Sequence, residues 1–84
     1  MSDITQYNRL FWHSRRGMLE LDLLLLPFLE EVYRDLPAED QKRYEQLLTC
    51  EDTDMFEWFM QRSQPKDPEL RRIVELIIKH AGPV

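Results

Sequence analysis

The chain has 84 residues, 43% of them hydrophobic and 32% charged, which is enough for one small globular domain over residues 1–84. Its 16 acidic and 11 basic residues give a net charge of -5, which disfavours binding to nucleic acid. A single cysteine excludes an internal disulfide and a cysteine-based metal cluster. Because so small a domain cannot enclose a dinucleotide and keep a full core, we expect a binding or helper protein rather than an enzyme.

The N-terminal end predicts a protein that stays inside the cell. It has no apolar secretory segment, so we expect a cytoplasmic location and a reduced Cys50. The strongest apolar run, residues 23–29, is far shorter than the roughly 20 residues that cross a bilayer, so we expect no membrane insertion. Residues 1–16 carry three arginines and one aspartate, whereas the rest of the chain is acidic. The basic end is therefore predicted to face an anionic patch on a partner.

Apolar residues at helical spacing predict an all-α fold, a small bundle of about five helices. The first helix is predicted over residues 4–14, with Ser2 or Asp3 as its cap and Gly17 at its end. The second is predicted over residues 18–34, and its leucine content indicates the central helix, buried on more than one side. Pro27 is predicted to kink it.

Three more helices are predicted to follow. The third begins near Pro37, and the charged residues within 39–43, Asp40 included, are predicted to face water. Residues 49–52 fit a relaxed capping box that opens the fourth helix. Residues 67–68 are predicted to begin the fifth helix, and residues 82–83 to end it. Eight apolar side chains are predicted to lie in the core: Leu19, Leu23, Leu26, Leu29, Leu47, Phe56, Ile73 and Ile77.

Residues 15–22 are the stretch most indicative of function. Gly17 lacks a side chain, so another backbone can approach closely. Arg16 offers a planar fork for a carboxylate or phosphate, and Glu20, predicted one helical turn further on, can point at the same spot. The alternative interpretation is a plain junction between two helices, with glycine for the bend and the charges solvated.

Other polar residues give weaker signals. His13 and His80 have no carboxylate or cysteine at metal-ligand spacing, so we predict no metal site, and no pattern indicates a catalytic residue. Asp22 is flanked by leucines and is predicted to need a partner, either Arg9 or Arg15, if it is buried. The sequence does not decide whether three aromatic residues of the first helix lie in the core or contact a partner: Tyr7, Phe11 and Trp12. For Trp58 it favours the core.

The segment Arg16-Gly17-Met18-Leu19-Glu20 resembles the Arg-Gly-x-x-Glu signature of the succinate dehydrogenase assembly factors, the flavinylation factors of bacteria and mitochondria. Leu47-Leu48 followed by residues 51–58 resembles the second block of that family, and the likeness runs from about Tyr7 to Ile78. Thr53 departs from the pattern, because many members have proline there.

This resemblance implies a five-helix assembly chaperone rather than an enzyme. Such a protein binds the flavoprotein subunit of succinate dehydrogenase, and in bacteria often that of fumarate reductase, and promotes covalent attachment of FAD to a histidine there. No cofactor is expected to be bound tightly, and a monomer is expected. Glu20 would lie near the acceptor histidine, and Arg16 would grip an anionic group of the partner. The residues assigned to partner binding are Arg15, Arg16, Gly17, Glu20, Asp52 and Asp54.

A second hypothesis is a general protein-interaction module, such as the antitoxin half of a toxin–antitoxin pair. Co-purification separates the two hypotheses. The first requires a flavoprotein subunit among the captured proteins, whereas the second requires a membrane or cytoskeletal target.

Overall fold

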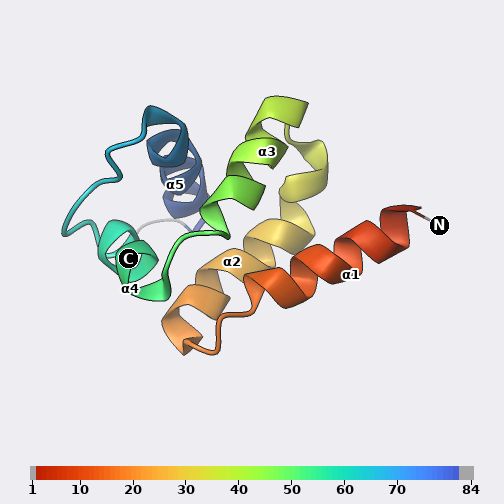
Figure 1. The fold of residues 1–84 in the computed structure, drawn as a ribbon, viewed down its shortest axis with the longest axis horizontal. Coiled ribbons are helices and arrows are strands. Elements are labelled where there is room, and N and C mark those ends of the chain that lie inside the picture. The colour runs from red at the N-terminus through yellow and green to blue at the C-terminus, as the bar shows by residue number, and fades with distance from the viewer. Residues whose placement is uncertain (1, 82–84) are drawn as a thin grey trace.

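The computed structural model describes the backbone of residues 2–81 and the side chains of residues 8–81. The predicted stop at residues 82–83 and the side chain of Tyr7 lie outside the described residues. The predicted start of the first helix at residue 4, with Ser2 or Asp3 as its cap, was wrong, because the helix already begins at Ser2. Over the described part of the chain there are helices and no strand, which confirms the all-α prediction (Figure 1). The elements are α1 (Ser2–Ser14), α2 (Leu19–Glu31), the 3-10 turn η1 (Tyr33–Asp35), α3 (Ala38–Leu47), α4 (Asp52–Phe59) and α5 (Pro68–Ala81).

Helix α2 is the central element, as predicted. It packs against α1, α4 and α5, and α3 packs against α5. Figure 1 shows α1 alongside α2 at the lower right, with α3, α4 and α5 grouped on the other side. Helix α1 extends the molecule along its longest dimension, and the overall extents are 40 × 26 × 23 Å.

Helix α2 buries one face rather than several. Its core residues recur every three or four positions: Leu21, Leu25, Phe28 and Leu29. The prediction that Leu19 and Leu23 are buried was wrong, because they are 68% and 64% exposed, and Leu26 is only half-buried. Two rows of the helix carry leucine at the same period, so the period could not tell which row meets the neighbouring helices.

The rest of the core follows the prediction closely. Four of the predicted core residues are buried: Leu29, Leu47, Ile73 and Ile77. A fifth, Phe56, is half-buried and packs against the core. At the centre, the fully buried Tyr44 stacks on Phe28 with ring centroids 5.7 Å apart. Its hydroxyl lies 2.7 Å from the buried Ser14 hydroxyl, so a hydrogen bond joins α3 to the last residue of α1. The buried polar groups are thereby satisfied within the core.

Two later helix ends also differ from the predictions. Helix α2 was predicted to reach residue 34, but it passes through Pro27, ends at Glu31 and leads through Val32 into η1. The prediction of a capping box at residues 49–52 was wrong, because no side chain caps α4. The Thr49 hydroxyl instead donates to the Gln46 carbonyl at 2.6 Å. Thr49 therefore closes α3, since a threonine hydroxyl can bond a nearby backbone group in either direction.

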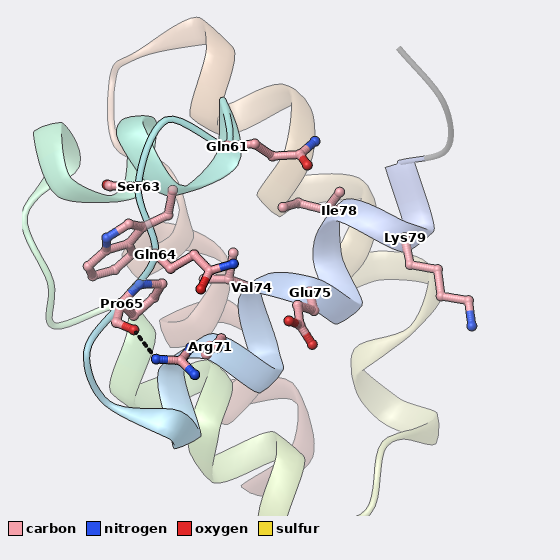
Figure 2. Close-up of a pocket in the computed structure, with 10 residues that line it drawn as sticks. Gln61, Ser63, Gln64, Pro65, Arg71, Val74, Glu75, Ile78 and Lys79 are labelled. Carbon is pink, nitrogen blue, oxygen red and sulfur yellow. Dashed lines mark hydrogen bonds between the residues drawn. The ribbon is translucent and has the colours of Figure 1, made fainter.

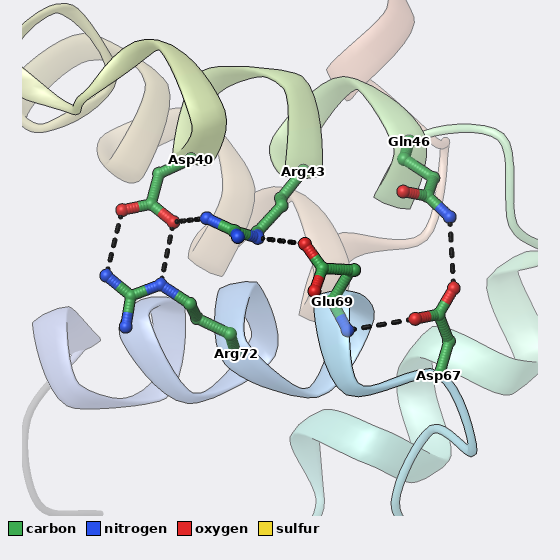
Figure 3. A network of polar contacts seen from close by, with 6 residues as sticks. All are labelled: Asp40, Arg43, Gln46, Asp67, Glu69 and Arg72. Atoms are coloured by element: carbon green, nitrogen blue, oxygen red, sulfur yellow. Dashed lines mark hydrogen bonds and ion pairs between the residues drawn. The ribbon is translucent and has the colours of Figure 1, made fainter.

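The predicted start of α5 is confirmed. Pro68 is its first residue, and the Asp67 carboxylate accepts a hydrogen bond from the Glu69 N–H at 2.9 Å. Asp67 also accepts a bond from Gln46 of α3 at 3.2 Å, as Figure 3 shows. The same side chain therefore caps α5 and ties it to α3.

Asp40 was predicted to face water but is 2% exposed. Its carboxylate accepts two hydrogen bonds from Arg72 of α5, at 2.8 and 3.0 Å, and one from Arg43 at 2.7 Å (Figure 3). Arg43 donates in turn to Glu69 at 2.7 Å. A carboxylate is tolerated at this depth because its charge is paired and hydrogen-bonded. Sequence reasoning missed the pairing because Arg72 lies on a different helix.

The two leucine rows of α2 predict effects of very different size for the same substitution. Leu25→Ala should lower the free energy of unfolding by about 2–5 kcal/mol, because it empties a fully buried site. Leu23→Ala, on the exposed row, should change it by less than about 0.5 kcal/mol. Urea denaturation of both variants measures the difference, and equal losses would contradict the one-sided burial.

Asp40 makes stability depend on pH. The hydrogen bonds from Arg72 and Arg43 hold the pKa of Asp40 below its ordinary value, against the effect of burial. Its contribution is therefore present above the unfolded pKa of about 4 and is lost as pH falls through the lowered pKa. Asp40→Asn should lower the urea midpoint at pH 7, and its difference from wild type should shrink below about pH 4. Asp35→Asn, at an exposed position, is the matched control, and a pH-independent difference for Asp40→Asn would contradict this assignment.

Candidate functional site

The turn between α1 and α2, residues 15–18, contains the residues that the sequence singled out. Gly17 is exposed and has a φ of 79°, a conformation that costs other L-residues free energy. A Cβ added at Gly17 would meet nothing within 4 Å, so the constraint is conformational rather than steric. The turn therefore presents a bare backbone to solvent, as the interpretation of Gly17 as a docking residue requires.

Arg16 points into the protein. Its Nε donates to Asp52 Oδ1 at 3.0 Å and its Nη1 donates to the His13 carbonyl at 2.9 Å. Its Nη2 donates to the carbonyls of Leu48 and Cys50, both at 2.7 Å. The side chain is 12% exposed. One guanidinium thus joins the last turn of α1 to the segment between α3 and α4 and to the first residue of α4.

Asp22 has a different partner from the one predicted. Its Oδ1 accepts a hydrogen bond from the backbone N–H of Arg16 at 2.9 Å, where the sequence suggested the side chain of Arg9 or Arg15. The contact closes the turn from the side of α2. The expected one-turn spacing of Arg16 and Glu20 was also wrong, because residues 15–18 are not helical.

The outer side of the turn is apolar as well as charged. Leu19 and Leu23 are largely exposed, and their i, i+4 spacing places them on one face of α2 beside the exposed Glu20. Trp12 of α1 is 66% exposed, and the Arg15 guanidinium lies 5.6 Å from the centre of its ring. We call the exposed group of six residues the turn face: Trp12, Arg15, Gly17, Leu19, Glu20 and Leu23.

The acidic pair of the second sequence block lies next to this turn. Asp52 and Asp54 are in the first turn of α4, where the helix dipole favours negative charge. Asp52 is bonded to Arg16, whereas Asp54 is exposed. The structure therefore brings both predicted blocks together through one ion pair. The sequence analysis did not predict the carbonyl groups around Arg16 or the exposure of Leu19 and Leu23. The only sequence signal for the exposed leucines was the second leucine row on α2.

A separate hollow lies between the loop after α4 and helix α5. Its volume is about 300 Å³, and it contains none of the predicted site residues. Figure 2 shows its wall, where Arg71 donates to the Pro65 carbonyl at 3.2 Å. Trp58, predicted for the core, is half-buried and lines this hollow. The volume is at the lower limit of small-molecule sites.

Within residues 8–81, no cluster of three or more histidine, cysteine or carboxylate side chains has a geometry suited to a metal ion. Burial raises the pKa of the Cys50 thiol, the acidic neighbour Asp54 adds to the effect, and the thiol therefore stays protonated at neutral pH. Among the described helices, none has the length and apolar character needed to span a bilayer.

The fold and the turn face define a small helical protein that exposes a mixed apolar and charged surface. Residues 8–81 match the family described as "Flavinator of succinate dehydrogenase", and the chain belongs to that family. It is 60% identical to the FAD assembly factor SdhE of Pseudomonas aeruginosa over 83 residues, 99% of both chains. It is 57% identical to the protein of the same name from Pseudomonas putida, with the same coverage. The protein of that name from Shewanella oneidensis is 48% identical over 75 residues, 89% of this chain and 92% of the relative.

The positive φ of Gly17 predicts a graded response to substitution. Gly17→Ala should lower the free energy of unfolding by roughly 1–2 kcal/mol, because alanine is strained in this conformation. Gly17→Asn should cost less, since asparagine tolerates the left-handed region and the space around the position is open. Thermal and urea unfolding of the two variants measure the order, and an Ala variant as stable as wild type would contradict it.

Proposed function

We propose that this chain is an assembly factor that promotes covalent attachment of FAD to the flavoprotein subunit of succinate dehydrogenase, and also to that of fumarate reductase. It acts as a cytoplasmic, monomeric chaperone that holds no cofactor tightly, and the bond-forming chemistry belongs to the partner and its flavin. The observation that carries the proposal is the family match over residues 8–81, together with relatives named FAD assembly factor over 99% of the chain.

The turn face is the proposed docking surface for the flavoprotein subunit. Leu19, Leu23 and Trp12 are all more than 60% exposed within twelve consecutive positions, residues 12–23. Single exposed leucines are ordinary, but a group of large apolar side chains beside a bare glycine backbone indicates a surface that a partner covers. Burying one such leucine against a partner contributes roughly 1.5–3 kcal/mol.

Glu20 is the proposed functional carboxylate of this surface. It is exposed in the first turn of α2. In the complex it would hold the acceptor histidine of the partner in the tautomer and orientation that attack the flavin. Such positioning lowers the barrier without any covalent bond to this chain. Asp54, also exposed, is the proposed second acidic contact.

The proposal is tested by restoring covalent flavin in cells that lack their own assembly factor. The wild-type chain should restore the in-gel fluorescence of covalent flavin on the dehydrogenase subunit. Glu20→Ala should reduce it about tenfold or more, which corresponds to about 1.4 kcal/mol of lost positioning. Glu30→Ala is the matched control, because Glu30 is an exposed glutamate at the other end of the same helix.

The outcomes separate the parts of this proposal. If cells with and without the wild-type chain have the same amount of covalent flavin on the dehydrogenase subunit, the assembly role is contradicted. Full flavin yield with Glu20→Ala would contradict the role of Glu20 alone. Glu20→Gln shows whether the charge matters, because glutamine keeps a hydrogen-bond acceptor of similar reach. Co-purification of each flavoprotein subunit with the wild-type chain tests the two proposed partners separately.

A further inference from the structure

We infer that Arg16 is a positioning residue: it is locked inside the protein, fixes the turn face in the shape that docks, and does not itself contact the partner. This inference rests on the proposed function, because its readout is docking to the flavoprotein subunit. It reverses the sequence-based expectation that Arg16 grips an anionic group of the partner.

The hydrogen bonds of Arg16 within the chain leave few of its N–H groups available to a partner. A guanidinium has five N–H groups, and the bonds to Asp52, His13, Leu48 and Cys50 occupy four of them. The two bonds from Nη2 are short, at 2.7 Å, as expected for a charged donor. A forked contact with an outside carboxylate would break several of these bonds. It would also leave the Leu48 and Cys50 carbonyls without this donor.

The position of these contacts explains what the arginine does. The turn between α1 and α2 is short, its glycine is exposed, and nothing lies within 4 Å of the Gly17 Cβ position. Arg16 fixes this turn from both sides, through its side chain to the α3–α4 segment and through its backbone N–H to Asp22 of α2. The lock consists of Arg16, Asp22 and Asp52.

The sequence-predicted partner residues therefore fall into two groups. Arg15, Gly17, Glu20 and Asp54 are exposed and belong to the surface proposed to contact the partner. Arg16 and Asp52 hold that surface in place. A surface that is already ordered avoids the free-energy cost of ordering a loop during association. Loss of the lock should therefore weaken docking while the helices remain folded.

A double-mutant cycle on the affinity for the purified flavoprotein subunit tests the inference. Arg16→Lys should weaken binding about tenfold or more, because an ammonium cannot make the forked contacts of the guanidinium. Asp52→Asn should weaken it about threefold or more. The double variant should bind about as weakly as Arg16→Lys alone, because both substitutions remove the same lock. Glu51→Gln is the matched control, since it removes an exposed acidic charge one residue away.

Two affinity results would overturn the inference. If the loss of affinity in the double variant equals the product of the two single losses, Arg16 contacts the partner independently of Asp52. An Asp52→Asn variant that binds like Glu51→Gln would mean that the ion pair does not support docking. A wild-type chain that does not bind either flavoprotein contradicts the proposed function itself, and this result is distinct from both.

Amide hydrogen exchange without any partner gives a second readout, which holds even if Arg16→Lys is too unstable to assay. In Asp52→Asn, the N–H groups of Arg16, Leu21 and Asp22 should exchange faster than in wild type, because these amides form the bonds of the turn. The N–H of Ile77 in α5 should be unchanged. Equal protection of the turn in both proteins would overturn the lock.

Discussion

One guanidinium group ties the turn between α1 and α2 to the segment between α3 and α4. Arg16 lies in the short link between α1 and α2, yet its hydrogen bonds reach α1, the end of α3 and the start of α4. Helix ends have unsatisfied carbonyl groups, and a planar, permanently charged donor with five N–H groups is the side chain best suited to collect several of them at once. A small domain with limited apolar burial gains much from such a cross-link.

The contact between α3 and α5 also depends on one buried charged group, but here the group is a carboxylate. At the α3–α5 contact a buried carboxylate, Asp40, collects two arginines, whereas near the turn a largely buried arginine collects carbonyls and one carboxylate. The Ser14–Tyr44 hydrogen bond is buried, and Tyr44 belongs to the apolar core. Together these contacts fix the register of helices that the leucine-rich core alone would hold less specifically.

The rigid support matters because the surface that it carries is unfavourable in water. Leu19, Leu23 and Trp12 remain exposed although the domain is short of apolar burial. A protein that works by covering part of another protein needs such a surface, and it needs that surface ordered before contact. The family match over residues 8–81 gives this geometry its biological setting. In the proposed function, this chain supplies shape and one carboxylate, and the partner supplies the flavin chemistry.

The sequence by itself determined the helical class, the start of α5 and the identity of the family. These features depend on local signals: apolar period, an Asp-Pro cap, and a glycine placed where the backbone turns. The sequence also drew attention to the right segment, because Arg16, Gly17 and Glu20 are neighbours along the chain. The sequence also placed Gly17 after the end of the first helix, and the positive φ found there is one that glycine adopts without strain.

Only the tertiary structure decided which way the side chains of that segment face. Arg16 and Asp40 each also have partners far along the chain: Asp52, Leu48 and Cys50 for Arg16, and Arg72 for Asp40. These partners are 32 to 36 positions away, so no pattern of short range contains them. The same holds for α2, where two leucine rows have one period and the neighbouring helices select the row that is buried. A charged residue looks alike in the sequence whether it is solvated or paired, because the free energy that separates the two states comes from groups brought together by folding.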